Sequence, residues 1–135
     1  MSQTIFPAVR YREADAALRW LKAAFGAEEK AVYRGDDGVV QHAELRIGGG
    51  LIMLGQYSSE GWLAGEPPNP LASTVSLYIV VPDPDAHHDG AAAAGATVVR
   101  ELQDMDHGSR EYSVRDPEGN LWSFGTYDPN TAGGD

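Results

Sequence analysis

The stretch RDPEGNLWSFG, residues 115–125, decides the fold of this chain of 135 residues. It contains DPEGN at residues 116–120, where proline presets φ and glycine supplies a left-handed position, as a hairpin turn requires. The residues that follow, 121–127, predict a strand. The C-terminal part of the chain is therefore expected to end in a β-hairpin.

The ending of this stretch occurs twice in the chain. The pattern L-x-x-x-G-x-Y spans residues 51–57 and again residues 121–127, a shift of 70. A shift of 69 pairs Gly26 with Gly95 and Ala17 with Ala86. We place the one-residue difference in the hairpin turns, where an insertion costs little. The two halves therefore form an internal repeat.

Both halves have the same order of predicted elements. The first half predicts a strand, a helix and three strands at residues 4–11, 13–25, 28–34, 39–47 and 51–55. The second half predicts the same series at residues 74–81, 84–94, 97–102, 109–115 and 121–127. Asp83 is expected to cap the second helix, and Gly26 to end the first in a left-handed conformation. The sequence therefore predicts an α+β fold with two βαβββ modules in tandem.

We expect one domain, residues 1–135, with module one at 4–55 and module two at 74–127. Residues 56–73 between them hold three prolines and Trp62 and have no clear period. A stretch of this length is either a linker or a functional lid. The tail, 128–135, is expected to be mobile.

Composition excludes several classes of function. The chain has no cysteine, which rules out disulfides, thiolate metal sites and a cysteine nucleophile. Its net charge of -10 argues against nucleic-acid partners, because binding there relies on neutralising phosphates. We find no apolar run of membrane-spanning length and no signal peptide, so we expect a cytoplasmic protein without a membrane partner.

The repeat and the segment 115–125 together resemble the vicinal oxygen chelate superfamily, which includes glyoxalases, bleomycin-resistance proteins and extradiol dioxygenases. The bleomycin-resistance-like and uncharacterised glyoxalase-like members are the most similar. The resemblance covers about residues 4–127. It implies curled mixed sheets that form a cavity, with the helices on the outer face. It also implies a homodimer, often with modules exchanged between chains.

The resemblance also implies where a metal would be bound. Metal-dependent members place His, Gln or Glu on the first and last strand of each module. The corresponding residues are Pro7 and Met53 in module one and Ser76 and Ser123 in module two. Proline has no side-chain donor, Met is soft and Ser is a weak ligand. We therefore expect no metal and no cofactor.

Strand alternation indicates which other polar side chains face the cavity. In residues 39–47, Ala43, Leu45 and Ile47 are expected on the helix-packed face. His42 and Glu44 then share the concave face. They could hold a ligand, form an acid–base pair, bind a displaced metal, or simply form a salt bridge at a polar strand edge.

Module two offers related positions. Glu111 is the repeat mate of His42, and Ser123 follows the hairpin turn. Tyr78 shares its strand parity with Ser76 and should face the cavity. Trp62 could close over the mouth of the cavity, since aromatic surfaces suit planar or cationic ligands. The predicted ligand-binding residues are His42, Glu44, Trp62, Tyr78, Glu111 and Ser123.

Other conspicuous residues are assigned structural roles. Tyr112, Trp122 and Phe124 are expected to face the helix as core. His87 and His88 are adjacent on the second helix and are expected on a solvated surface.

Three classes of function remain open. The first is a protein that binds a small organic ligand, cationic or aromatic, in a metal-free cavity at a dimer interface, for drug or metabolite sequestration. The second is a metal-dependent glyoxalase-like lyase, isomerase or dioxygenase with a non-standard site around His42 and Glu44. The third is an interaction protein with a vestigial cavity. The sequence names neither the ligand nor the reaction.

Overall fold

The structure is a computed structural model that describes residues 3–59 and 66–131. The chain divides into two compact units, Met1–Asn69 and Pro70–Asp135, which are described separately as unit one and unit two. Within the described residues, neither helix has the length and hydrophobicity needed to cross a membrane.

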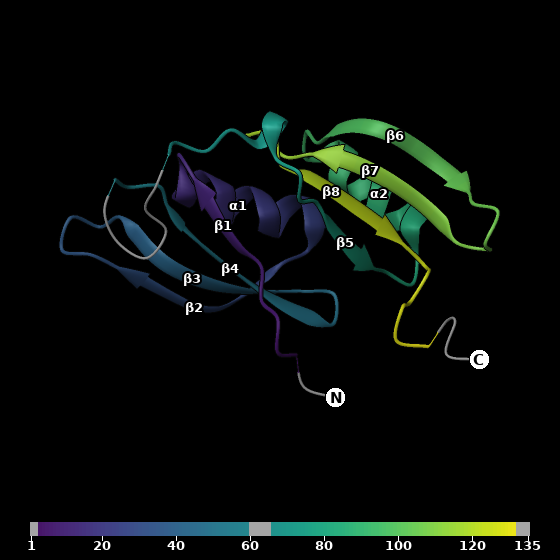
Figure 1. Ribbon diagram of the computed structural model, residues 1–135, viewed down its shortest axis with the longest axis horizontal. Coiled ribbons are helices and arrows are strands. Elements are labelled where there is room, and N and C mark those ends of the chain that lie inside the picture. The colour runs from purple at the N-terminus through teal and green to yellow at the C-terminus, as the bar shows by residue number, and fades with distance from the viewer. Residues whose placement is uncertain (1–2, 60–65, 132–135) are drawn as a thin grey trace. The chain divides into compact units, whose positions relative to one another are not determined.

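Unit one contains a four-stranded mixed sheet and one helix (Figure 1). Its elements are β1 (Ala8–Tyr11), α1 (Ala14–Phe25), β2 (Glu28–Arg34), β3 (Val40–Ile47) and β4 (Gly50–Gln56). The strand order is β1-β4-β3-β2, with β1 parallel to β4 and the other pairs antiparallel. The first and last strands of the unit are therefore neighbours.

Helix α1 covers one face of this sheet. Its inward positions are Ala14, Ala17, Leu18 and Leu21, all buried at helical spacing. They meet the alternate side chains of β3 and β4 that are also buried, which include Ala43, Leu45, Ile47, Ile52 and Leu54. The side chain of Gln56 accepts a hydrogen bond from the first helical N–H, at Ala14. Gly26 ends the helix at φ 70°, as predicted.

Unit two repeats this arrangement. Its elements are a 3₁₀ turn (Pro70–Ala72), β5 (Leu77–Val80), α2 (Pro84–Ala93), β6 (Thr97–Asp104), β7 (Arg110–Arg115) and β8 (Leu121–Gly125). The strand order is β5-β8-β7-β6, with β5 parallel to β8. Two four-stranded mixed sheets, each with its own helix, confirm the predicted α+β fold of tandem βαβββ modules.

The core of unit two is aromatic. Tyr112, Trp122 and Phe124 are fully buried, as predicted. Asp83 caps α2 through a hydrogen bond from the Ala86 N–H, also as predicted.

The turn between β7 and β8 is organised by one carboxylate. Asp116 is buried and accepts hydrogen bonds from the backbone N–H groups of Glu118 and Asn120 and from the indole of Trp122. Gly119 supplies the positive φ, 99°. The turn and the core are thus joined through Asp116, because the carboxylate that closes the hairpin also satisfies the buried indole.

The prediction of a solvated surface for His87 and His88 is wrong. The His87 ring lies 4.1 Å from the Phe124 ring, and its Nδ1 lies 2.5 Å from the Tyr112 hydroxyl. His88 packs edge-on against Tyr112 and bridges Asp89 and Glu101. Both histidines replace inward-facing apolar residues of the helix.

The repeat relates the two histidines to buried positions of the first helix, which their adjacency alone did not indicate. The residues that cap the two helices, Glu13 and Asp83, are 70 apart, so Ala17 corresponds to His87 rather than to Ala86. The shift becomes 69 at Gly26 and Gly95, which both have positive φ. Module two is therefore one residue shorter than module one between the start of its helix and Gly95. It is one residue longer between Gly95 and the last strand, where the shift returns to 70.

Several predicted strands are shorter in the structure. The strand predicted at 4–11 begins at Ala8, and the one predicted at 74–81 is β5, which begins at Leu77 and ends at Val80. The last strand ends at Gly125 instead of Tyr127, because the Tyr127 N–H donates to the side chain of Ser109 rather than to a neighbouring strand.

Candidate functional site

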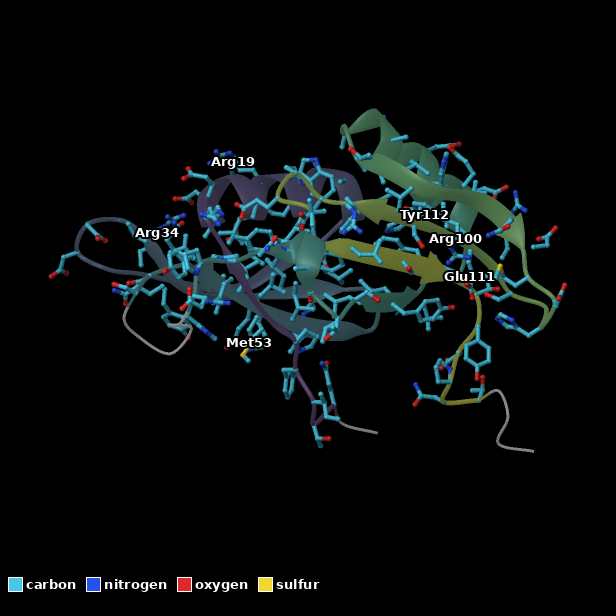
Figure 2. All side chains as sticks on the ribbon, turned by 45° about the horizontal axis from the view of Figure 1, so that its top comes forward. Arg19, Arg34, Met53, Arg100, Glu111 and Tyr112 are labelled. Atoms are coloured by element: carbon cyan, nitrogen blue, oxygen red, sulfur yellow. The ribbon has the colours of Figure 1, made fainter. Side chains whose placement is uncertain are left out.

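Each sheet has a second face, turned away from its own helix, which we call its open face. In unit one the register places Ala8 beside Met53, and Met53 beside Glu44. His42 lies beside Tyr33 on the same face. Figure 2 shows Met53 on the side of the sheet away from α1.

His42 and Glu44 form a close pair on the open face of unit one. Their Nε2 and Oε2 atoms are 2.9 Å apart, and the Lys30 ammonium lies 3.3 Å from the other carboxylate oxygen. The hydrogen bond from His42, followed by that from Lys30, lowers the pKa of Glu44 below its ordinary value. The Tyr33 ring lies 5.8 Å from the imidazole. The predicted shared face is confirmed, and the two side chains do meet.

Glu111 is the centre of the open face of unit two. It is 8% exposed, and its carboxylate lies 3.2 Å from the Arg100 guanidinium and 3.4 Å from His107 Nε2. Burial by itself raises the pKa of Glu111, but hydrogen bonds from Ser109 and Arg100 outweigh burial and lower it. Figure 2 shows Arg100 and Glu111 side by side. Glu111 is therefore held as a carboxylate.

Tyr78 approaches Glu111 across Gly125. The Tyr78 hydroxyl donates to the Tyr127 carbonyl at 2.8 Å, and burial raises the pKa of the phenol. A Cβ at Gly125 would lie 2.6 Å from Glu111 Cγ and 2.7 Å from the Tyr78 oxygen. Only glycine at this position therefore leaves room for both side chains.

A chain of hydrogen bonds links Arg100 to Ser123. Arg100 Nε donates to Ser113 Oγ at 3.2 Å, and Ser113 Oγ lies 2.7 Å from Ser123 Oγ. Ser123 also pairs with Tyr78 in the parallel ladder. Ser113 is buried, whereas Ser123 is half-buried on the open face.

Five of the six predicted residues fall on the two open faces, in two separate groups. His42 and Glu44 belong to unit one, and Tyr78, Glu111 and Ser123 to unit two. Trp62 lies outside the described residues. Ser76 is not in β5, and the strand partner of Ser123 is Tyr78 rather than Ser76. On the first strand of unit one, Ala8 and not Pro7 is the register partner of Met53.

Sequence reasoning missed Arg100, because strand alternation gives the wrong face. Val98 pairs with Val114 on the helix side, yet Arg100, two residues on, pairs with Ser113 on the open face. A register shift between them reverses the alternation. Lys30 lies at a similar shift in β2, between Glu29 and Ala31. In each unit a register shift in the strand after the helix, β2 or β6, thus places a basic side chain beside a glutamate: Lys30 beside Glu44 and Arg100 beside Glu111.

Comparisons with known proteins agree with this architecture. Residues 5–124 match the model of the Glyoxalase/Bleomycin resistance protein/Dioxygenase superfamily, and the chain belongs to that family. An uncharacterized protein of Mycobacterium tuberculosis is 36% identical over 115 residues, which are 84% of this chain and 68% of that protein.

Solved structures show the same fold. TioX from Micromonospora sp. ML1 is 33% identical, with a TM-score of 0.72 over 91% of this chain and 94% of its own. The fosfomycin resistance protein FosX from Mesorhizobium loti is 16% identical, with a TM-score of 0.64 over 96% of each chain. The second likeness is one of fold alone.

The residues present do not fit the metal site of the metal-dependent members. The first- and last-strand neighbours on the open faces are Ala8 with Met53 and Tyr78 with Ser123. This set contains neither an imidazole nor a carboxylate, the donors that divalent ions prefer. Across residues 3–59 and 66–131, no three His, Asp or Glu side chains gather as a metal site would require.

Proposed function

We propose that this protein binds a small organic ligand in a metal-free cavity at a dimer interface, and that it serves to sequester a drug or a metabolite. The observation that carries the proposal is the identity of the residues at the first- and last-strand positions, Ala8 with Met53 and Tyr78 with Ser123, none of which is a His, Asp or Glu. Membership of a family whose names include a drug-resistance protein supports it.

The side chains of the open faces suit a ligand with polar and aromatic parts. Tyr33 and Tyr78 offer exposed ring surface, 58% and 37% exposed. Glu44 and Glu111 offer carboxylates whose pKa values lie below the ordinary value. The net charge of -10 favours a cationic ligand through the long-range field of the protein.

Thermal stabilisation tests the proposal. A ligand that binds the folded state stabilises it by RT ln(1 + [L]/Kd), so a library of antibiotics and metabolites should contain compounds that raise Tm. Added Zn²⁺, Ni²⁺, Fe²⁺ or Mn²⁺ should leave Tm unchanged, and elemental analysis should find less than one metal per chain. One bound metal per chain would contradict the metal-free cavity.

A second candidate is an enzyme built on the His42–Glu44 pair. The 2.9 Å separation of Nε2 and Oε2 favours it, because a carboxylate that orients an imidazole is an arrangement used in general acid–base catalysis. This candidate requires either bound metal or enzymatic turnover in the wild-type protein. Whichever is found should be lost in both His42→Ala and Glu44→Ala.

A further inference from the structure

The route of hydrogen bonds from Arg100 to Ser123 has a direction. A guanidinium has N–H donors and no acceptor, so the Arg100 Nε–H must donate to Ser113 Oγ. The Ser113 hydroxyl then has its own hydrogen to place. Its remaining hydrogen-bond partner in the described part of the chain is Ser123 Oγ, at 2.7 Å.

Burial fixes the next step. Ser113 is 5% exposed, so leaving its hydrogen without an acceptor would carry a desolvation cost. Ser113 therefore donates to Ser123, and the Ser123 hydrogen is left to point outward. Ser123 is half-buried on the open face, and within residues 3–59 and 66–131 its hydroxyl has no acceptor besides Ser113.

The charge on Arg100 strengthens this chain. A hydroxyl that accepts from a cation becomes a stronger donor, and successive bonds polarise one another in a partly buried setting. Glu111 and Met105 hold the same guanidinium, through Nη2 and Nη1. The position of Arg100 is therefore fixed on three sides.

We propose that Ser123 Oγ is a polarised hydrogen-bond donor that binds a carbonyl or carboxylate oxygen of the ligand. This inference rests on the proposed function and adds the chemistry of one ligand group. Ser123 lies beside Tyr78 on the open face of unit two. The Arg100–Ser113–Ser123 relay places a donor there, so the ligand presents an acceptor oxygen to β8.

Three small aromatic probes test this in solution. Benzoate presents an oxyanion, N,N-dimethylbenzamide presents a neutral carbonyl, and N,N-dimethylbenzylamine has the same size with a cation and no carbonyl. Titrations of ¹⁵N-labelled protein should show benzoate and the benzamide shifting the backbone amide signals of Ser113 and Ser123. The benzylamine should shift them less.

Variants separate the relay from its surroundings. Ser123→Ala should weaken binding of the benzamide about 5- to 10-fold, the loss expected for one hydrogen bond to a neutral carbonyl, and binding of benzoate by more than about 10-fold, because a hydrogen bond to an anion is stronger. Ser123→Thr keeps a hydroxyl and should retain binding. Ser113→Ala should give an intermediate loss, and Ser73→Ala, in the exposed segment before β5, should change nothing. The amide spectrum of each variant verifies that it is folded.

The outcomes also separate this inference from the proposed function. Equal binding of all three probes, or binding that survives in Ser123→Ala, overturns the relay and leaves a ligand-binding protein. Probe binding that shifts amide signals only on the open face of unit one would likewise overturn the relay and leave a ligand-binding protein. Failure of these probes at Ser123, together with no stabilising compound in the library, overturns both.

Discussion

Gly125 is where a single added methyl group would disturb unit two most directly. In Gly125→Ala the new Cβ would meet Glu111 Cγ and the Tyr78 hydroxyl at 2.6 and 2.7 Å. We expect a loss of about 1–3 kcal/mol in the free energy of unfolding, as for other over-packed sites. Urea denaturation measures it. Gly90→Ala, within α2 and with no atom beyond the helix's own backbone within 4 Å of the new Cβ, should instead gain about 0.5–1 kcal/mol.

Glu111 predicts a pH dependence of stability. Its pKa lies below 4.5 in the folded protein, so the carboxylate stabilises the fold above that pH. This stabilisation is lost as the pH falls through the folded pKa. Glu111→Gln should lower the free energy of unfolding at pH 7 and flatten its decline below pH 4.5.

Urea titrations between pH 7 and pH 3 make this comparison. Asp106→Asn is the control, because Asp106 is an exposed carboxyl in the turn just before β7. If the free energy of unfolding of Glu111→Gln falls with decreasing pH as steeply as that of the wild type, other carboxyl groups cause the decline.

At the scale of elements, α2 packs on its sheet through histidines. His87→Ala removes the ring against Phe124 and leaves the buried Tyr112 hydroxyl without its partner. We expect a loss of about 2–4 kcal/mol. In the double variant His87→Leu with Tyr112→Phe, both polar groups are absent and stability should return close to that of the wild type. Additive losses in a double-mutant cycle would show that the two side chains are not coupled.

The elements themselves could be predicted from sequence wherever a local signal exists. Gly26, Asp83 and the 116–120 turn each fix the backbone by their own chemistry, and the structure has them as expected. The strand ends could not be predicted, because they depend on partners. Tyr127 leaves the sheet because Ser109, distant in sequence, captures its N–H.

The candidate site was predictable only where strand alternation is regular. The pairing of β3 with β4 and of β7 with β8 is regular, so the alternation of side chains predicted the face of His42, Glu44, Glu111 and Ser123. Arg100 and Lys30 lie at register shifts, which no local pattern marks. The histidines of α2 were misplaced because their adjacency was taken to indicate a solvated surface, whereas both rings pack against buried aromatic residues.

At the scale of the whole molecule, we expect a homodimer. Each sheet ends in edge strands, and exposed edges favour pairing or cover by another chain. Light scattering coupled to gel filtration should give about twice the 14.5 kDa of one chain at micromolar concentration. A mass of one chain under these conditions would contradict the expected dimer.

The parallel pair that joins the first and last strand of each unit has a consequence for how such a chain arises. Because β1 lies beside β4, and β5 beside β8, each unit begins and ends on adjacent strands. A gene segment that encodes one such unit can be copied head to tail without any change in strand order. Afterwards each copy can gain or lose single codons in its connections, where residues 13–26 and 83–95 differ in length by one residue, while the pairing of its outer strands stays in place.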